Sequence, residues 1–181
     1  MSIDLSTLSV QALDAVAAER HAAALGMLLH DCVLAGASVG FVLPYTSAEG
    51  EAFWRKHVLP GVRAGEVTLL AAWSGGRLAG TVQLGCDTMP NQRHRAEVRK
   101  LLVHPDCRRR GIARALMHEL EDHARRAGRS LLTLDTRTGD AAEPLYASLG
   151  YRVAGVIPQF ARDAVSDRLD ATTLMYKQLA A

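Results

Sequence analysis

The stretch VRKLLVHPDCRRRGIARAL, residues 98–116, decides how the rest of the chain is interpreted. Residues 98–103 are mostly apolar and predict a strand. Residues 104–110 form a turn crowded with arginine. From Gly111 the apolar residues recur at helical spacing, which predicts a helix to about Ala127. The sequence therefore predicts a strand, a basic loop and a helix N-terminus in immediate succession.

This succession is suited to an anion. The first backbone N–H groups of a helix have no intrahelical partner, and the helix dipole favours negative charge there. Gly111 allows a ligand to approach the backbone closely. Arg108, Arg109 and Arg110 add charge-assisted donors for phosphate oxygens. We expect a phosphate or pyrophosphate cradle; the alternative is a basic turn that only caps a surface helix.

Two common phosphate motifs, the P-loop and the dinucleotide-binding G-x-G-x-x-G, are not found at this strand–helix junction. The pattern R-x-x-G-x-A is present at Arg108, Gly111 and Ala113. It resembles the acetyl-coenzyme A signature Q/R-x-x-G-x-G/A of the GNAT acetyltransferase superfamily. A second segment, Leu145-Tyr146-x-x-Leu149-Gly150-Tyr151, is similar to a later motif of that superfamily.

Composition places the chain among globular proteins. It has 181 residues, 49% hydrophobic and 22% charged, which predicts one domain over residues 1–181. The net charge of +2 argues against a nucleic-acid partner. The three scattered cysteines favour reduced thiols and a cytoplasmic setting. We expect no signal peptide and no membrane span.

The resemblance implies the GNAT fold, a mixed α/β sheet of about six to seven strands with flanking helices in the order β-α-α-β-β-β-α-β-α-β-β. The apolar pattern agrees with this order. We expect helices over 10–34, 47–64 (kinked at Pro60), 111–127 and 141–149, and strands over 3–8, 67–73, 78–84, 96–103, 131–136, 151–157 and 169–179. The strands over 96–103 and 131–136 should be parallel neighbours because a helix joins them.

The resemblance also implies how acetyl-coenzyme A is held. The strand before the basic loop splays from its parallel neighbour, and its backbone at Leu101, Leu102 and Val103 would bond the pantetheine amides. Arg114 is a weaker candidate for the 3′-phosphate. The pyrophosphate would lie on the amides of Arg109, Gly111, Ile112 and Ala113, with Arg108 and Arg110 as side-chain partners.

Acetyl transfer to an amine requires removal of a proton. An alkyl ammonium group has a pKa near 10, so only about one in a thousand is neutral at pH 7. A well-placed carboxylate is typically worth roughly 10²–10⁴ in rate. Glu97 and Asp135 are the candidates, Asp135 because a carboxylate within LLTLDT would be costly to bury unpaired. The structural alternatives are pairing of Glu97 with Arg95 or Arg99, and for Asp135 either pairing with Arg137 or capping of the turn.

The leaving thiolate needs a proton or a hydrogen bond. In many GNAT enzymes the tyrosine of the second motif supplies it, which implies this role for Tyr146. The alternative is a half-buried tyrosine with a structural hydroxyl. The superfamily often has Asn seven residues earlier, where this chain has Gly139. The cofactor tail is therefore expected to be held differently.

The acceptor is suggested by GASVGF at residues 36–41, together with RAEV at 95–98 and LDT at 134–136. These segments resemble the tabtoxin-resistance branch of the superfamily, whose members acetylate an amino-acid-like toxin. The alternative for 36–41 is a glycine-rich helix exit. The resemblance implies substrate contacts at Ser38, Val39, Phe41, Glu97 and Asp135.

We therefore expect an N-acetyltransferase that moves an acetyl group from acetyl-coenzyme A directly to a primary amine of a small molecule. A binding module that senses acetyl-coenzyme A, and an enzyme acting on protein N-termini or lysines, are the alternatives. We expect no metal site, since His118-Glu119 is not followed by histidine at the spacing of a zinc motif. A homodimer built on the final strands is compatible with the sequence.

Overall fold

The computed structural model describes residues 8–180 and contains a seven-stranded sheet in the order β1-β2-β3-β4-β5-β7-β6. The strands are β1 (Ser9–Leu13), β2 (Val67–Ser74), β3 (Arg77–Gly85), β4 (Arg95–Val103), β5 (Leu131–Arg137), β6 (Arg152–Arg162) and β7 (Leu169–Gln178). The helices are α1 (Ala15–Arg20), α2 (Ala22–Leu34), α3 (Ser47–Phe53), α4 (Leu59–Arg63), α5 (Ile112–Arg126) and α6 (Ala142–Ser148). Short helical turns are the π-turn η2 (Trp54–Val58) and the 3-10 turns η3 (Pro90–Gln92) and η4 (Pro105–Cys107).

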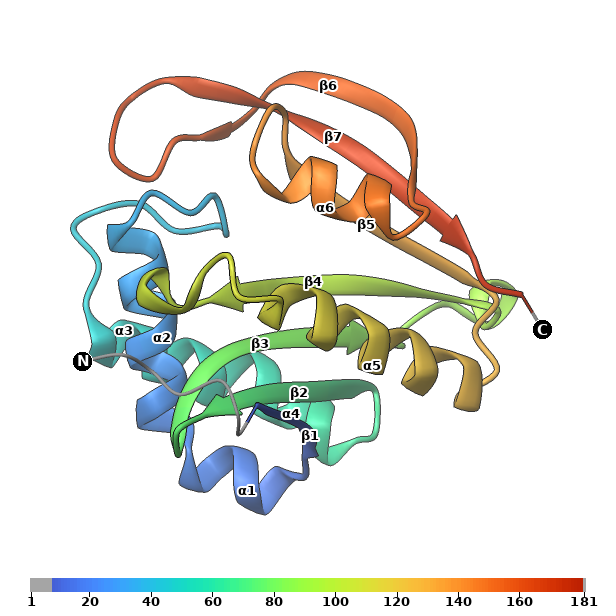
Figure 1. Cartoon of the computed structure of the whole chain (residues 1–181), viewed down its shortest axis with the longest axis horizontal. Coiled ribbons are helices and arrows are strands. Elements are labelled where there is room, and N and C mark those ends of the chain that lie inside the picture. Colours follow the sequence, from blue (N-terminus) through green and yellow to red (C-terminus); the bar gives the residue numbers. More distant parts are fainter. Residues whose placement is uncertain (1–7, 181) are drawn as a thin grey trace.

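Strands β1 to β4 form an antiparallel meander. β4 and β5 are parallel, as α5 between them predicts, and β7 then pairs antiparallel with both β5 and β6. Figure 1 shows β4 and β5 close together near the C-terminus of the chain and apart at the opposite end. This mixed α/β sheet with flanking helices confirms the predicted fold.

Two hydrophobic clusters cover the two faces of the sheet. Leu70 faces α5 and packs with Leu116 and Leu120, whereas the adjacent Leu69 faces α2 and packs with Leu25 and Trp54. Successive side chains of a strand point to opposite faces, so one apolar strand serves both clusters. The centre of the sheet is therefore covered by α5 on one face and by the N-terminal helices on the other, whereas β6 is largely exposed.

The predicted helix over 10–34 is wrong at its start. Val10 lies in β1 and pairs with Ala72, because the segment adds a strand to the free edge of β2. The Asp14 side chain caps α1 by accepting from the Ala17 N–H at 2.7 Å, and the helix is interrupted at His21. Residues 3–7 of the predicted first strand lie outside the described residues.

The second predicted helix is continuous in path but changes its hydrogen-bond pattern. Thr46 and Glu49 form a capping box at the start of α3. Five residues, Trp54–Val58, then form a π-turn before α4. Pro60 has no N–H to donate, so the helix cannot continue unchanged through it. The sequence predicted a kink at Pro60; the structure instead changes its helical pattern earlier, at Trp54, and Pro60 lies in the first turn of α4.

Candidate active site

The gap between β4 and β5 organises the site. The parallel ladder joins Arg95 to Leu131 and ends at the pair Glu97 and Thr133. Beyond Thr133, β5 continues along β7. The polar backbone edge of residues 100–103 is therefore turned toward the gap, where it can bond a ligand as an added strand does. The predicted splay of these two strands is present.

A β-bulge accompanies the separation. Thr81 pairs with Leu102 and Gln83 pairs with Arg99, so Lys100 and Leu101 share one place on the partner strand. Lys100 has a φ of +49°, a left-handed conformation that non-glycine residues seldom adopt. The hydroxyl of Thr81 donates to the Lys100 carbonyl at 3.4 Å. The bulge turns the end of β4 away from the ladder.

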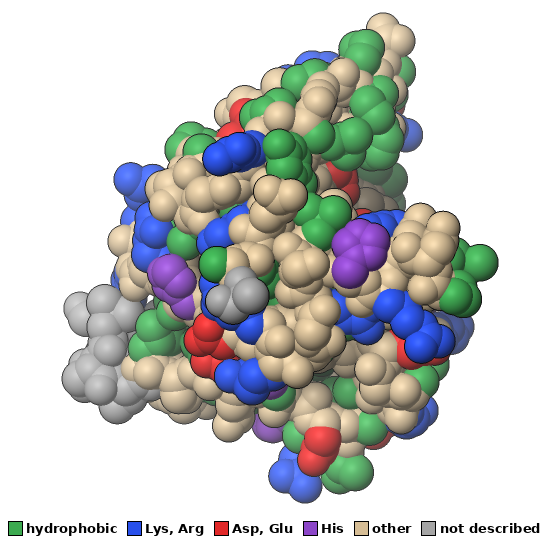
Figure 2. Space-filling model, turned by 90° about the vertical axis from the view of Figure 1, so that its right-hand side faces the viewer, with side chains coloured by type: hydrophobic (Ala, Val, Ile, Leu, Met, Phe, Trp, Pro, Cys, Tyr) green, Lys and Arg blue, Asp and Glu red, His purple; other side chains and the backbone are tan. Residues whose placement is uncertain are grey.

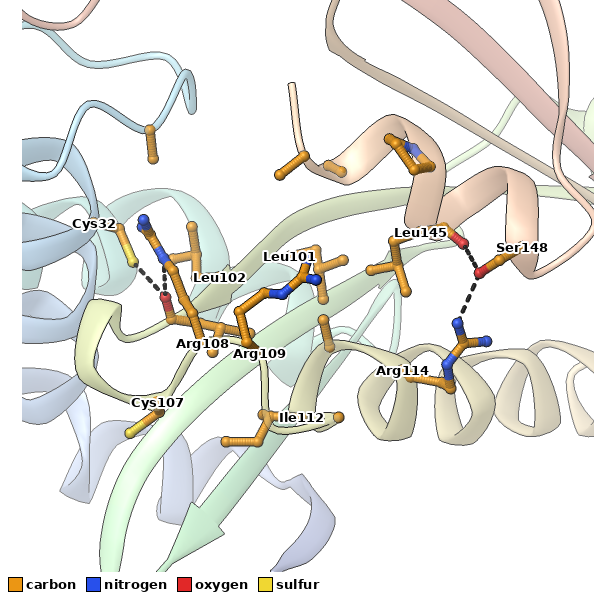
Figure 3. Close-up of a pocket in the computed structure, with 17 residues that line it drawn as sticks. Cys32, Leu101, Leu102, Cys107, Arg108, Arg109, Ile112, Arg114, Leu145 and Ser148 are labelled. Carbon is orange, nitrogen blue, oxygen red and sulfur yellow. Dashed lines mark hydrogen bonds between the residues drawn. The ribbon is translucent and has the colours of Figure 1, made fainter. Parts of the chain in front are cut away.

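A cavity of about 600 Å³ lies between the end of β4, the start of α5 and α6 (Figure 3). All but one of the residues predicted to bind the cofactor line this cavity. These are Leu101, Leu102, Val103, Arg108, Arg109, Gly111, Ile112, Ala113 and Arg114. Arg110 is on the same loop but does not line the cavity.

Other lining residues were not identified from the sequence. Cys32 comes from α2, and Pro144, Leu145 and Ser148 come from α6. Cys32, Pro144 and Ser148 belong to no sequence motif, and Leu145 opens the second motif without having been assigned a binding role, because these residues reach the cavity only through the packing of distant elements. Pro144, Leu145 and Ser148 line the cavity from α6, whereas Cys32 lies beside the end of β4, where its thiol donates to the Val103 carbonyl.

The start of α5 has the features of an anion cradle. Gly111 is the N-cap residue with a φ of +80°, and without a side chain it leaves the first-turn N–H groups uncapped. Ile112 and Ala113 carry two of these groups and line the cavity. The unpaired strand edge and the uncapped helix start fit an elongated ligand that carries amides at one end and phosphates at the other.

Two of the predicted phosphate-binding arginines contact protein atoms instead. Arg108 Nε donates to the carbonyl of Val103 at 3.4 Å, and the Cys32 thiol donates to the same carbonyl at 3.5 Å. Arg114 Nη2 donates to the Ser148 hydroxyl at 2.8 Å, linking α5 to α6 across the cavity (Figure 3). Burial raises the pKa of Cys32 to about 11, although Arg108 lowers it in part.

The two candidate carboxylates lie on neighbouring strands. Glu97 accepts from Arg99, with Nη2 to Oε2 at 2.7 Å, so the predicted alternative pairing is present. Asp135 accepts from the Thr172 hydroxyl at 3.2 Å, whereas Arg137 pairs with other carboxylates. The expectation that Asp135 is buried is wrong: it is exposed, because β4 has left β5 before this position.

Tyr146 is on α6 and is 5% exposed. Its ring centroid is 5.7 Å from that of Tyr151. Burial, with smaller contributions from Asp135 and Asp140, raises the pKa of Tyr146 well above its usual range. The phenol is therefore protonated at neutral pH, as a proton donor must be. The influence of Asp135 shows that this carboxylate lies within electrostatic range of the tyrosine.

The predicted acceptor segment lies between α2 and α3. Val39 and Phe41 pack against the cluster under these helices, and Ser38 is half-buried. Phe41 is within 5.0 Å of the Phe53 ring, centroid to centroid. The Lys100 ammonium lies over both rings and was not identified from the sequence. Nothing in the sequence around Lys100 indicates that it lies beside Phe41 and Phe53, because these residues are far apart in the chain.

Gly139 has a φ of +78°, and its N–H donates to Glu143 Oε2 at 2.6 Å. Asparagine tolerates this left-handed conformation better than most residues, so glycine is a conformationally matched replacement for it. The carboxamide is lost, while the turn before α6 is kept.

Among residues 8–180, no cluster of three or more His, Cys, Asp or Glu side chains is arranged to hold a metal ion. Within the same residues, no helix has the length and apolar character needed to cross a membrane.

The comparisons with known proteins decide the family. A family model described as acetyltransferase (GNAT) family matches residues 37–151, more than half of the chain. The chain belongs to the GNAT acetyltransferase family. Family membership confirms the enzyme class and the cofactor predicted from the sequence, an acetyltransferase that uses acetyl-coenzyme A.

Solved structures share the GNAT fold along nearly the whole chain. yncA, a putative acetyltransferase from Salmonella typhimurium solved with its cofactor acetyl-CoA, is 23% identical with a TM-score of 0.74, covering 96% of this chain and 94% of that one. A ribosomal-protein-alanine N-acetyltransferase from Brucella melitensis is 23% identical with a TM-score of 0.76, covering 94% and 99%. A putative phosphinothricin N-acetyltransferase is 16% identical with a TM-score of 0.78, covering 97% and 100%.

Proposed function

We propose that this GNAT protein transfers the acetyl group of acetyl-coenzyme A to the primary amine of a small, amino-acid-like molecule. One observation carries the proposal: past Glu97 and Thr133, the gap between β4 and β5 has the cofactor cavity at the end of β4 and two carboxylates beside it. Donor and acceptor could thus meet at one gap and react directly.

The chain's own residues would bind the donor along the cavity. The backbone edge of residues 101–103 offers hydrogen bonds to amides, and the N–H groups of Ile112 and Ala113 offer a cradle for phosphate oxygens. When bound, acetyl-coenzyme A supplies the acetyl group as a reactive thioester. Arg109 extends over the cavity toward Leu101 (Figure 3), where its guanidinium adds positive charge.

Proton transfer would be divided between two ends of the gap. Glu97 or Asp135 accepts a proton from the acceptor ammonium, directly or through a water. Of these, Asp135 is bonded to a neutral hydroxyl, whereas Glu97 is already engaged by Arg99. Tyr146 holds a proton on its phenol oxygen for the departing sulfur, and burial keeps that proton in place at neutral pH.

The sequence segments shared with the tabtoxin-resistance branch support an amino-acid-like acceptor. Phe41 and the two carboxylates belong to those segments. The Lys100 ammonium lies over the Phe41 ring, and Asp135 and Glu97 both act on its charge, which supports one acceptor region near Lys100. The structural likeness to a putative phosphinothricin N-acetyltransferase is compatible with this class but shows only the fold.

The test is release of coenzyme A thiol across a panel of amines, with mass spectrometry of products and acetyl-coenzyme A binding measured in parallel. We expect tight cofactor binding and one class of acetylated small amine. Asp135→Asn should lower kcat/KM by roughly 10²-fold or more. Asp122→Asn on the exposed side of α5 is the matched control and should leave it unchanged.

The outcomes separate the alternatives. Cofactor binding without product from any amine, peptide or protein would favour a sensor module. Acetylation of protein N-termini or lysines alone would replace the small-molecule proposal. An absence of cofactor binding would refute the role of the cavity.

Three further expectations stay proposals: a single domain, a cytoplasmic setting and a homodimer. A single domain over residues 1–181 is supported by a sheet whose strands run from Ser9 to Gln178. The cytoplasmic setting rests on the free thiols of Cys32, Cys86 and Cys107. Sedimentation velocity would test both the domain's integrity and its association state.

A homodimer is supported by apolar side chains exposed on the β6–β7 hairpin. Val153, Val156 and Phe160 of β6 are each more than half exposed. Figure 2 shows hydrophobic side chains gathered over the upper part of the molecule, where Figure 1 places β6 and β7.

A further inference from the structure

Lys100 is the residue of the site that neither the sequence motifs nor the proposed chemistry explains. It occupies the bulge of β4 with a φ of +49°, in the strand that borders the gap. Backbone strain of this kind persists only where the surroundings hold it in place, and it concentrates at functional sites. Thr81, fully buried on β3, holds the bulge through its bond to the Lys100 carbonyl. The strand register and the Thr81 hydrogen bond therefore fix the backbone from which the Lys100 side chain extends.

The ammonium group is placed against aromatic rings rather than against an acid. Lys100 Nζ is 5.8 Å from the centroid of Phe41 and 5.5 Å from that of Phe53. A cation over an aromatic face is attracted by the ring quadrupole without losing its capacity to donate hydrogen bonds. Among residues 8–180, no carboxylate oxygen lies within 4.0 Å of this nitrogen. The three donors of Lys100 are thus not consumed by an ion pair in the described part of the chain.

The neighbouring Arg99, unlike Lys100, forms ion pairs with described residues. Arg99 is engaged by both Glu97 and Asp87, at 2.7 and 3.0 Å. Asp135 and Glu97 act on Lys100 through space and favour its charged form, while burial, assisted by Arg99, lowers its pKa. Lys100 is therefore a partly desolvated cation beside two carboxylates that it does not contact.

Lys100 and the two carboxylates therefore offer an acceptor molecule a binding group for an anion and a binding group for a cation. The ammonium group of an acceptor would be drawn to Asp135 and Glu97, which the proposed function requires. We propose that Lys100 binds the carboxylate of the acceptor, so that the site selects α-amino acids and related zwitterions over simple amines. The inference rests on the proposed acetyltransferase activity and names the part of the acceptor that the chain recognises. The Gly40 backbone adjoins the ammonium, since a Cβ there would lie 3.8 Å from Nζ, and the absent side chain leaves room for a ligand.

The test compares matched acceptors. Each of the standard L-amino acids is assayed against its carboxamide, which keeps the amine and side chain but removes the negative charge. For the best acceptor pair we expect the wild-type protein to have a KM at least about tenfold lower for the acid, as a charge-assisted hydrogen bond provides. Lys100→Met, which keeps the stem over the rings, should abolish that preference. Acetyl-coenzyme A binding should be unchanged.

Two variants control for charge and for folding. Lys100→Arg keeps a cation at the bulge and should retain most of the preference. Lys56→Met removes an exposed lysine of η2 and should have no effect on it. If Lys100→Met does not fold, Lys100→Gln serves in its place and should likewise abolish the preference for the acid.

The outcomes distinguish this inference from the proposed function. Acetylated amines without any preference for the acid, or a preference that survives Lys100→Met, would overturn the role of Lys100 and leave the acetyltransferase intact. No acetylated amine at all, with or without cofactor binding, would remove the small-molecule activity itself, and the role of Lys100 with it.

Discussion

Gly26 on α2 lies against Gly50 on α3 where these two helices cross, and replacing Gly26 with alanine would test how this layer is held together. A Cβ on Gly26 would lie 2.5 Å from the backbone nitrogen of Glu51 and 2.8 Å from the carbonyl oxygen of Ser47. Cβ atoms in proteins essentially never come closer than 3.0 Å to such atoms. Because the obstructing atoms are backbone, no side-chain rotation relieves the overlap and the helices must move apart.

The magnitude follows from two opposing effects. Alanine favours the helix over glycine by about 1 kcal/mol. Overpacking a well-filled interior costs about 1–3 kcal/mol, and contacts with rigid backbone belong at the upper end of that range. The net loss is therefore about 2 kcal/mol, which corresponds to a fall in Tm of roughly 4–8 °C for a chain of this size.

Thermal unfolding followed by circular dichroism measures this loss, and urea unfolding gives the free energy independently. Gly155→Ala is the matched control, because a Cβ there meets nothing within 4 Å. That variant should be as stable as the wild-type protein or slightly more stable. A Gly26→Ala variant with an unchanged or higher Tm would refute the close helix crossing.

Three other variants or treatments probe the site and the core. Tyr146→Phe should lower kcat by roughly 10²-fold or more with little change in acetyl-coenzyme A affinity, because only the proton donor is lost; stopped-flow turnover would measure it. Cys32, with a pKa of about 11 against an ordinary 9.0, should be about 100-fold less ionised at pH 8 than an ordinary cysteine, so iodoacetamide mass mapping should find it unmodified unless the pH approaches 11. Lys177→Met should cost about 2 kcal/mol in urea unfolding, because the buried Glu121 carboxylate loses its 2.6 Å partner and keeps only Arg125 at 3.5 Å, and adding Glu121→Gln should restore much of that stability.

The local order of the central segment could be predicted from the sequence. The change from an apolar run to helical spacing at Gly111 defines a strand–loop–helix unit, because side-chain periodicity is a local property of the backbone. The parallel pairing of β4 and β5 followed from the helix between them. The start of the first helix was predicted wrongly. The apolar residues around Val10 are compatible with a helix or a strand, and pairing with the edge of β2 makes this segment a strand.

The candidate site was predictable where its residues are contiguous and unpredictable where they are not. The residues from Leu101 to Arg114 follow one another along one strand–loop–helix segment, and most of them line the cavity. Ser148 and Cys32 reach the same cavity from α6 and α2. The exposed state of Asp135 depends on where the β4–β5 ladder ends, which no pattern within LLTLDT encodes.

The sequence by itself determined the family motifs, the order of the elements and the chemistry available at the start of α5, because each of these depends on residue type and short-range spacing. Only the tertiary structure decided that β4 leaves β5 after Glu97, that the bulge turns Lys100 toward Phe41 and Phe53, and that Arg108 bonds to the Val103 carbonyl. The physical reason is that these features are set by strand register and by contacts between segments far apart in the chain. Such contacts exist only once the sheet has closed around its two hydrophobic clusters.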